Sequence, residues 1–338
     1  MCFVIDVFVC RTAVATIKEV AKKARVSVGT VSNVLSGSIP VSKQLKDRVL
    51  DVIKLLDYHP NYVARSLKIR HTRMIGMIVS DIASPHVPQL VRGAEEAARQ
   101  ANYMLVTCNS DDQIERERQV LGDLRSRCVD GILLIAAAGD HAHVWAVRES
   151  GIPIVCLERE LPGFDCVAAN NFAGARQCVK HLASRGHRRI GMLNGDLKIE
   201  SASERHGGYR RGLEDEGIAY DESLVASGLE LLSREPRPSA ILTGNAALAL
   251  GLLGALKDFG LRCPDEIAIV TFDDPGYGEA LRPGLTVVAQ PSFEMGRQAM
   301  ELLLKRMEDP RRDRAKVVLE TKLVIRESSG SPSGVASA

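Results

Sequence analysis

Acidic pairs and arginines that lie near the ends of short apolar runs carry the first candidate chemistry in this sequence. The pairs Asp111–Asp112 and Asp273–Asp274 follow the runs YMLVTCNS and IAIVTF, Arg159 follows IPIVCLE, and Arg205 begins RHGGYRRGL. Paired carboxylates can act as a general acid and base. Ionised carboxylates also accept hydrogen bonds from a sugar or similar polyol, and arginines are matching donors. Both interpretations stay open here, and Arg205 could instead form a salt bridge on a helix face.

Other catalytic and cofactor motifs do not occur in the sequence. It contains no GxGxxG after an apolar run, no GxxxxGK[ST] phosphate loop and no GxSxG nucleophile turn. His141 and His143 could suggest a metal site, but no third ligand accompanies them, so a surface loop or helix start is favoured. Trp145 fits helix packing better than ligand stacking. The sequence therefore predicts no cofactor and no metal, and an enzyme would need a nucleophile–base pair that is not visible.

The elements that would position these residues begin at Met74, where apolar runs alternate with amphipathic stretches. This alternation indicates parallel sheets covered on both faces, and the length favours two α/β lobes. Ligands in such folds bind at the carboxyl ends of the strands, so the polar residues should surround one cleft. The expected strands are MIGMIVSDI, YMLVTCN, GILLIAA, IPIVCLE, RIGMLNG, SAILTG and IAIVTFDD, and the expected helices start near Pro88, Gln113, Phe172, Glu204 and Ala246.

A different chemistry is expected in the stretch TIKEVAKKARVSVGTVSNVLS, which spans Thr16–Ser36. It predicts two short helices joined by a tight turn, with N-caps Thr16 and Ser27 and a capping-box partner at Glu19. By helical geometry the outward side of the second helix carries Val28, Gly29, Ser32 and Asn33. A small, uncharged face flanked by cations is typical of a helix that enters the DNA major groove.

Basic residues are concentrated at the start of the chain. Residues 1–73 contain 13 Lys and Arg against 5 Asp and Glu, whereas the remaining residues contain 31 against 37. This distribution indicates a nucleic-acid partner for the head alone, because an ordinary solvated face would have acids interleaved. Ser42 should cap a third helix that closes the head core. Asn61 should cap a short hinge helix, YVARSLK, whose exposed Leu67 indicates that it forms on DNA or against a partner.

The chain ends and the cysteines carry little chemistry. Residues 1–15 predict a disordered leader rather than a signal peptide, because no cationic region precedes the apolar run and Asp6 interrupts it. Residues 329–338 predict a disordered tail. The eight cysteines lack zinc-type spacing and several lie inside apolar runs, which predicts reduced thiols and a cytoplasmic location. The apolar leader is too short to span a membrane, and no membrane partner is expected.

Taken together, these motifs resemble the lactose/galactose-repressor (LacI-type) family of transcription regulators over about residues 16–328. The carrying motifs are TIKEVAKKARVSVGTVSNVLS, YHPNYVARSLK, IASPH, VDGILLI, SRGHRRIGMLNG, RHGGYRRGL, LRCPDEIAIVTFDD and LRPGLTVV. The resemblance implies an α/β protein with an all-α helix-turn-helix head and hinge helix. A two-lobe effector domain of two parallel sheets, like a periplasmic binding protein, would follow. It also implies a homodimer on a near-palindromic double-stranded DNA operator.

The resemblance also assigns roles to individual residues. Three match positions that read DNA bases, namely Val28, Gly29 and Asn33. Five match positions that contact DNA phosphates, namely Thr16, Ser27, Thr30, Tyr58 and Asn61. Leu67 matches a leucine that wedges into the minor groove. Arg205 and Asp273 match effector-contacting positions, and the same cleft is expected to include His86, Arg159, Ser201 and Asn245.

The chain departs from the family pattern at several positions. Arg25 stands where a turn glycine is usual, and Asp57 replaces the glycine that usually precedes the tyrosine. Ala246 and Asn170 occupy positions where aspartates are common, and His86 occupies one that is often aromatic. The DNA role is unaffected by these changes, whereas a sugar of the usual type and ring stacking become less expected.

The predicted division of the chain is a DNA-binding domain at 16–60, a hinge helix and linker at 61–73, and an effector-binding and dimerisation domain at 74–328. The first lobe would comprise 74–158 plus 291–317, and the second 159–290 plus 318–328. The predicted function is a sequence-specific DNA-binding regulator, a repressor, switched by a small polar metabolite such as a sugar. The alternative is a periplasmic-type sugar-binding transport protein without its signal sequence, which would not carry a basic three-helix head.

Overall fold

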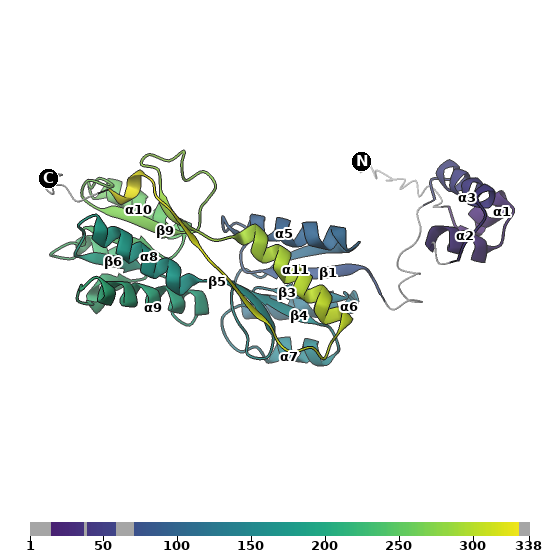
Figure 1. Cartoon of the computed structure of the whole chain (residues 1–338), viewed down its shortest axis with the longest axis horizontal. Helices are drawn as coiled ribbons and strands as arrows, with labels where there is room; N and C mark the ends of the chain where they lie inside the picture. Colours follow the sequence, from purple (N-terminus) through teal and green to yellow (C-terminus); the bar gives the residue numbers. More distant parts are fainter. Residues whose placement is uncertain (1–14, 37–38, 59–70, 331–338) are drawn as a thin grey trace, which may run out of the picture. The chain divides into compact units, whose positions relative to one another are not determined.

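The computed structural model describes residues 15–36, 39–58 and 71–330. The chain divides into two compact units, residues 1–72 and 73–338, and each is described by itself. In its described part, the first unit contains helices α1 (Ile17–Ala24), α2 (Val28–Ser36) and α3 (Lys43–Leu55). The second unit contains two six-stranded sheets covered by helices (Figure 1).

Side-chain caps explain where the first two helices begin. The Glu19 amide donates to Thr16 Oγ1 at 3.3 Å, and the Thr16 amide donates to the Glu19 carboxylate at 2.6 Å, which completes the predicted capping box. The Thr30 amide donates to Ser27 Oγ at 3.1 Å, as predicted for α2. Ser42 occupies the N-cap position of α3 but makes no side-chain cap hydrogen bond there.

The three helices close over a small core with strained turns at its edge. Val20, Val31 and Val49 are fully buried at its centre, one from each helix. Arg25 and Asp57, the two residues that replace expected glycines, have φ values of 53° and 47°. This left-handed conformation is costly for a residue with a Cβ atom, so both turns carry strain that glycine would avoid.

The first lobe of the second unit is built on a parallel sheet in the order β11-β5-β4-β3-β1-β2. Helices α5 (Val87–Gln100) and α11 (Ser292–Glu308) pack on one face, and α6 (Ile114–Ser126) and α7 (Ala142–Glu149) pack on the other. The strands are β1 (Met74–Val79), β2 (Met104–Asn109), β3 (Gly131–Leu134), β4 (Ile154–Leu157), β5 (Asp165–Ala169) and β11 (Lys316–Leu319).

The second lobe has the sheet order β12-β10-β9-β8-β6-β7, with only the β10–β12 pair antiparallel. Helices α8 (Asn171–Ser184) and α9 (Glu200–Asp215) cover one face, and α10 (Ala246–Asp258) covers the other. The strands are β6 (Ile190–Leu193), β7 (Val225–Ala226), β8 (Ala240–Thr243), β9 (Ala268–Phe272), β10 (Thr286–Ala289) and β12 (Lys322–Val324), and the 3₁₀ turns are η1 (Glu222–Leu224), η2 (Leu229–Ser233) and η3 (Glu327–Ser329). The two-lobe architecture predicted from the alternating pattern is confirmed.

The chain crosses between the sheets three times, after β5, between β10 and α11, and between β11 and β12 (Figure 1). The predicted end of the first lobe at 158 is wrong, because β5 pairs with β4 and β11 in the first sheet. The crossover therefore follows Ala169. The pattern missed β5 because only residues 158–164, without a helix, separate it from β4, whereas parallel neighbours usually need a longer crossover.

The predicted disordered tail also begins too early. Ser328 and Ser329 are fully buried. Ser329 is the first residue of that tail, and its hydroxyl lies 2.8 Å from His181 Nε2 and 2.7 Å from Thr286 Oγ1. Composition suggested disorder, but this small hydroxyl is buried between α8 and β10. Residues 331–338 of that predicted tail and residues 1–14 of the predicted leader lie outside the described residues.

A close helix crossing occurs in each lobe. A Cβ atom at Gly93 of α5 would lie 1.8 Å from Phe293 O, and one at Gly296 of α11 would lie 1.9 Å from Leu90 O. In the second lobe, a Cβ atom at Gly208 of α9 would lie 2.1 Å from the backbone oxygen of Phe172 in the first turn of α8. Only glycine permits these approaches, which place the first turns of α5 and α11 side by side.

Candidate functional site

The exposed side of α2 is the surface predicted to read DNA bases. Val28 is 42% exposed and Gly29 is exposed in the first turn, while Asn33 is half-buried further along the helix. An exposed valine provides an apolar contact for a thymine methyl group, and an asparagine amide can pair with an adenine edge. The sequence of α2 contains no acidic residue that would repel phosphate. The three predicted base-reading residues therefore lie on one accessible helix.

The predicted phosphate-contacting residues divide into two groups. Thr16 and Ser27 are exposed at the starts of α1 and α2, and Thr30 is half-buried beside Ser27. Helix starts favour anions because their amide hydrogens lack intrahelical acceptors. Tyr58 is different, since it is only 8% exposed and packs in the head core, where burial raises the pKa of its hydroxyl. The predicted residues Asn61 and Leu67 lie outside the described residues.

The carboxyl ends of three strands place acids in the second unit's interlobe site. Asp112 follows β2, Glu158 follows β4 and Asp273 follows β9. Their φ values are 54°, 62° and 69°, so all three are held in the left-handed region. Strained non-glycine residues cluster at functional sites because the surrounding structure must over-determine them. This placement agrees with the expectation that the polar strand ends meet around a cleft.

His86 connects acids from the two lobes at the start of α5. Its Nε2 lies 2.5 Å from Glu158 Oε1, and its Nδ1 lies 3.6 Å from Asp273 Oδ2 across the lobes. Burial disfavours the charged imidazole, but the two carboxylates outweigh that cost and raise the pKa of His86 to about 9. The His86 charge in turn lowers the pKa of Glu158 despite its burial. The imidazole is therefore protonated at neutral pH.

Both predicted arginines lie in the site, and each already has partners. Arg159 donates to Asp112 Oδ1 at 2.5 Å and to Ala136 O at 2.6 Å. Arg205, which is 9% exposed, donates to Asn171 Oδ1 at 2.8 Å and to the Gly244 backbone oxygen.

The Arg205 guanidinium also lies over the Phe272 ring, with its carbon 4.2 Å from the ring centroid. Arg205 therefore has a defined position in the cleft wall rather than the helix-face salt bridge considered from the sequence.

The remaining predicted effector residues are peripheral in this conformation. Asn245 caps α10 by accepting from the Leu248 amide at 2.9 Å, and Ser201 is half-buried in the first turn of α9. The sequence prediction missed Gln290, whose amide donates to Asp273 Oδ1 at 2.6 Å, and it did not assign Glu158 to the site. Gln290 and Glu158 both lie at strand ends, which could have marked them as candidates. The sequence does not show, however, which strand ends lie next to each other in the fold.

A pocket of about 470 Å³ opens beside His86 and Gln290. Residues of both lobes and of the β10–α11 connection line it, including Gln89, Asp274 and Ser292. Its size suits a small metabolite, and its mainly apolar lining carries a few polar groups, His86, Gln89 and Gln290 among them.

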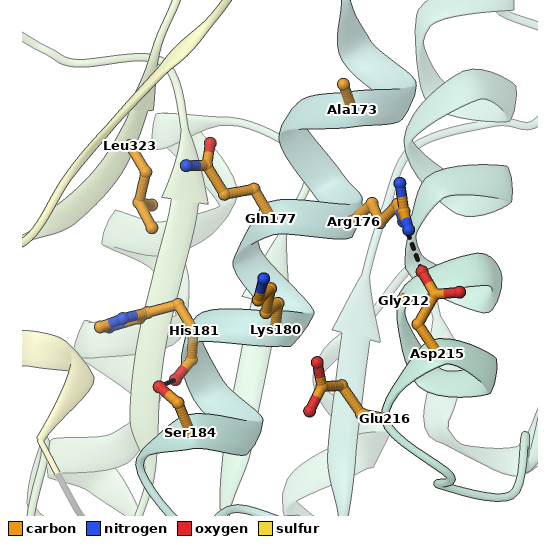
Figure 2. A pocket seen from close by; sticks show the side chains of 10 residues that line it. All are labelled: Ala173, Arg176, Gln177, Lys180, His181, Ser184, Gly212, Asp215, Glu216 and Leu323. Atoms are coloured by element: carbon orange, nitrogen blue, oxygen red, sulfur yellow. Dashed lines mark hydrogen bonds and ion pairs between the residues drawn. The ribbon is translucent and has the colours of Figure 1, made fainter.

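A second pocket, of about 700 Å³, lies along α8 and α9, where Arg176 pairs with Asp215 (Figure 2). None of the predicted effector residues lines it.

The pairing in the cleft does not support general acid–base catalysis. Asp112 accepts from Arg159, Asp273 accepts from Gln290 and Glu158 pairs with His86, so each carboxylate is engaged by a partner within the protein. His141 and His143 do not form a metal site: His143 Nε2 lies 2.7 Å from the buried Glu117 carboxylate. Among the described residues no cluster of potential ligands could hold a metal ion. None of the helices in this part of the chain is long and apolar enough to cross a membrane.

A head with a DNA-reading helix and a two-lobe body with a polar interlobe site define a ligand-responsive DNA-binding regulator. Residues 16–61 match the family of bacterial regulatory proteins named after lacI, and residues 179–329 match a periplasmic binding protein-like domain. The chain belongs to the LacI family of bacterial regulatory proteins, and it is a transcriptional regulator rather than an enzyme. The transport-protein alternative is not supported, because the head itself matches the regulator family.

Relatives and solved structures agree with this assignment. The chain is 35% identical over 324 residues to a ribose operon repressor of Halalkalibacterium halodurans, covering 93% of this chain and 97% of that protein. It is 32% identical to the transcriptional regulator CelR in its cellobiose complex, with a TM-score of 0.71 over 93% of this chain and 99% of that one. The lac repressor dimer bound to operator and the anti-inducer ONPF shares the fold, with a TM-score of 0.82, 24% identity and coverage of 94% and 100%.

Proposed function

We propose that this regulator represses transcription in the cytoplasm as a homodimer on a near-palindromic operator, and that a small polar metabolite in the interlobe cleft switches it. The observation that carries the proposal is the ion pair between the lobes, in which His86 Nδ1 of the first lobe lies 3.6 Å from Asp273 Oδ2 of the second lobe. Two of the relatives, a ribose operon repressor and a regulator in complex with cellobiose, support a sugar or related polyol as effector.

On DNA, α2 would occupy the major groove with Val28, Gly29 and Asn33 at the base edges. Thr16, Ser27 and Thr30 would fix its register through phosphate contacts, which position a reader without selecting sequence. We propose that residues 61–73 form the hinge and that Leu67 wedges into the minor groove at the operator centre. Two heads related by the dimer axis would require an operator of matching symmetry.

In the body, an effector that contacts both His86 and Asp273 would favour the closed arrangement of the lobes. A ligand shifts such an equilibrium only through its different affinities for the two states. Closure moves the amino-terminal ends of the first lobes relative to each other in a dimer, and therefore changes the spacing of the heads. The same coupling free energy makes operator DNA alter effector affinity in return.

The test is a binding titration of the full chain with its own upstream DNA and with random DNA of equal length. We expect preferential binding to the upstream DNA and an affinity that falls by orders of magnitude between about 50 and 200 mM salt. The exposed body variant Lys180→Ala on α8 should behave like the wild type. Equal affinity for both DNAs, or no salt dependence, would contradict the proposal.

A further inference from the structure

His86 has a buried ring nitrogen without a hydrogen-bond partner at the point where the lobes meet. Its Nε2 is engaged by Glu158, but Nδ1 has no partner and lies 3.6 Å from Asp273 Oδ2. That separation is too long for a hydrogen bond. The other oxygen of Asp273 already accepts from Gln290. The buried Nδ1 therefore faces Asp273 Oδ2 across the lobes at ion-pair distance but without a hydrogen-bond partner.

The charge state of His86 defines what can lie between these atoms. Glu158 and Asp273 favour the imidazolium, Arg205 opposes it, and the resulting pKa of His86 is about 9. Both ring nitrogens then carry a proton near neutral pH, so Nδ1 is a donor. Asp273 is only an acceptor. A single atom that contacts both must accept from His86 and donate to Asp273.

A hydroxyl group fits this requirement. An oxygen about 2.8 Å from both atoms is geometrically possible across a 3.6 Å gap, and a hydroxyl accepts and donates at once. A carboxylate or phosphate oxygen could accept from His86 but would face the Asp273 carboxylate with like charge. An ammonium group could donate to Asp273 but could not accept from His86.

The surrounding charges favour a neutral ligand for the same reason. Arg159 is paired with Asp112, and Arg205 is satisfied by Asn171 and the Gly244 backbone oxygen. The three cations of the site, His86, Arg159 and Arg205, are matched by three carboxylates, Asp112, Glu158 and Asp273. An anionic effector would therefore have to displace an existing carboxylate before it gained a cationic partner.

We propose, on the basis of the effector-controlled function above, that His86 and Asp273 share one hydroxyl of a neutral polyol, and that the Asp273 carboxylate excludes sugar acids from this position. The pocket of about 470 Å³ beside His86 holds the rest of the molecule, against Gln89 and Gln290. His86 is thereby a specificity-determining residue, and recognition depends on hydrogen bonding at this position rather than on aromatic stacking.

The test measures melting temperature and calorimetric affinity of the full chain with D-ribose, D-glucose, ribitol, D-ribonate and hypoxanthine. We expect at least one neutral polyol to stabilise the protein and D-ribonate to have no effect. His86→Gln should weaken the stabilising polyol at least tenfold. The matched variant His181→Gln, at a histidine of α8 that contacts Ser329, should not.

A pH series on the wild type gives a second readout that does not depend on any variant folding. Above about pH 9 the remaining His86 proton stays on Nε2 beside Glu158, so Nδ1 loses its donor and polyol affinity should fall. His86→Gln should remove that fall.

Three outcomes would overturn the inference: D-ribonate or hypoxanthine stabilises while no neutral polyol does, no probe stabilises, or the wild-type affinity is flat through pH 9. Loss of operator binding in the separate DNA titration would instead overturn the proposed function.

Discussion

The head and the interlobe cleft reach their chemistry by different routes. In the head, the residues that cap and present α2 lie within three positions of each other, as in the Ser27–Thr30 hydrogen bond. In the cleft, His86 and Glu158 are 72 residues apart, and His86 and Asp273 come from different lobes. The head surface is therefore largely a property of local sequence, whereas the cleft exists only when both sheets and the helices that follow their strands are in place.

The two regions also differ in what a single substitution can do. The head exposes small side chains on one helix, so a change there alters DNA contacts without disturbing buried charges. The cleft buries a network in which each charge depends on another, so removing one partner leaves the rest uncompensated. Variants in the head should therefore change DNA binding alone, and variants in the cleft should change the effector response alone. A variant that changes both would show that the two regions are not independent.

The largest effect is expected from Arg205→Leu. The guanidinium supplies hydrogen bonds to Asn171 and Gly244 and lies close to Asp273, so its removal leaves acceptors unsatisfied in a buried site. Effector affinity should fall by ~100-fold or more, which corresponds to about 3 kcal/mol. Operator affinity without effector should be unchanged. Arg211→Leu, at an exposed arginine of the same helix, is the control, and a matching loss of operator affinity would erase the distinction between the regions.

An effect of similar size is expected in the pH dependence of the free energy of unfolding, because of the charge on His86. The folded pKa of His86, about 9, lies above its unfolded value near 6.5. Its charge interactions therefore stabilise the fold fully below pH 6.5, and this contribution is lost as pH rises through 9. The free energy of unfolding should drop by on the order of 2–3 kcal/mol over that range relative to His86→Gln. Urea unfolding at pH 6, 7.5 and 9.5 measures it, and parallel curves for the two proteins would contradict the assignment.

Asn33→Ala should alter base preference with a smaller free-energy change. The side chain lies on α2 where an amide can pair with a base edge, a contact worth about 1–3 kcal/mol. A binding selection on randomised operators should show relaxed preference at one position in each half-site. Gln44→Ala, which removes an exposed amide from α3, is the matched control. Effector-induced melting shifts should stay the same in both variants, and an altered effector response would show that the head and the cleft are not separable.

The smallest effect is expected from Arg25→Gly. Glycine adopts φ near 53° without a Cβ penalty, so the head should gain about 1 kcal/mol in free energy of unfolding. Amide exchange in α1 and α2 measures that gain. Lys23→Gly, within α1, should instead lose about 1 kcal/mol. If Arg25→Gly loses stability, the arginine side chain must contribute more to the head than the backbone strain costs.

The head could be predicted from the sequence almost residue by residue. Thr16, Glu19 and Ser27 form the predicted caps because a cap hydrogen bond joins residues three apart. The predicted face of Val28, Gly29 and Asn33 follows from helical periodicity alone. Two residues are exceptions: Ser42 makes no side-chain cap hydrogen bond, and Tyr58, to which the resemblance gave a phosphate contact, is largely buried.

The sequence predicted that polar residues at strand ends form the cleft, but it did not predict which of these residues contact each other. Hydrophobic periodicity does not show that β5 belongs to the first sheet, because the short connection between β4 and β5 contains no helix. It also cannot report that Gln290 meets Asp273, or that the glycine crossing of α5 and α11 brings His86 beside the β10–α11 connection. Interior helix glycines were the available signal, since they are costly unless another backbone approaches.

The sequence by itself determined the helix-turn-helix head, the two α/β lobes and the residue types of the site, because capping, periodicity and charge act over a few neighbouring residues. The tertiary structure alone decided which of those residues meet. The pairing of His86 with acids of both lobes depends on three chain crossings and on backbone contacts between distant helices. Those long-range contacts convert two separate strand ends into one site with a single open hydrogen-bonding position.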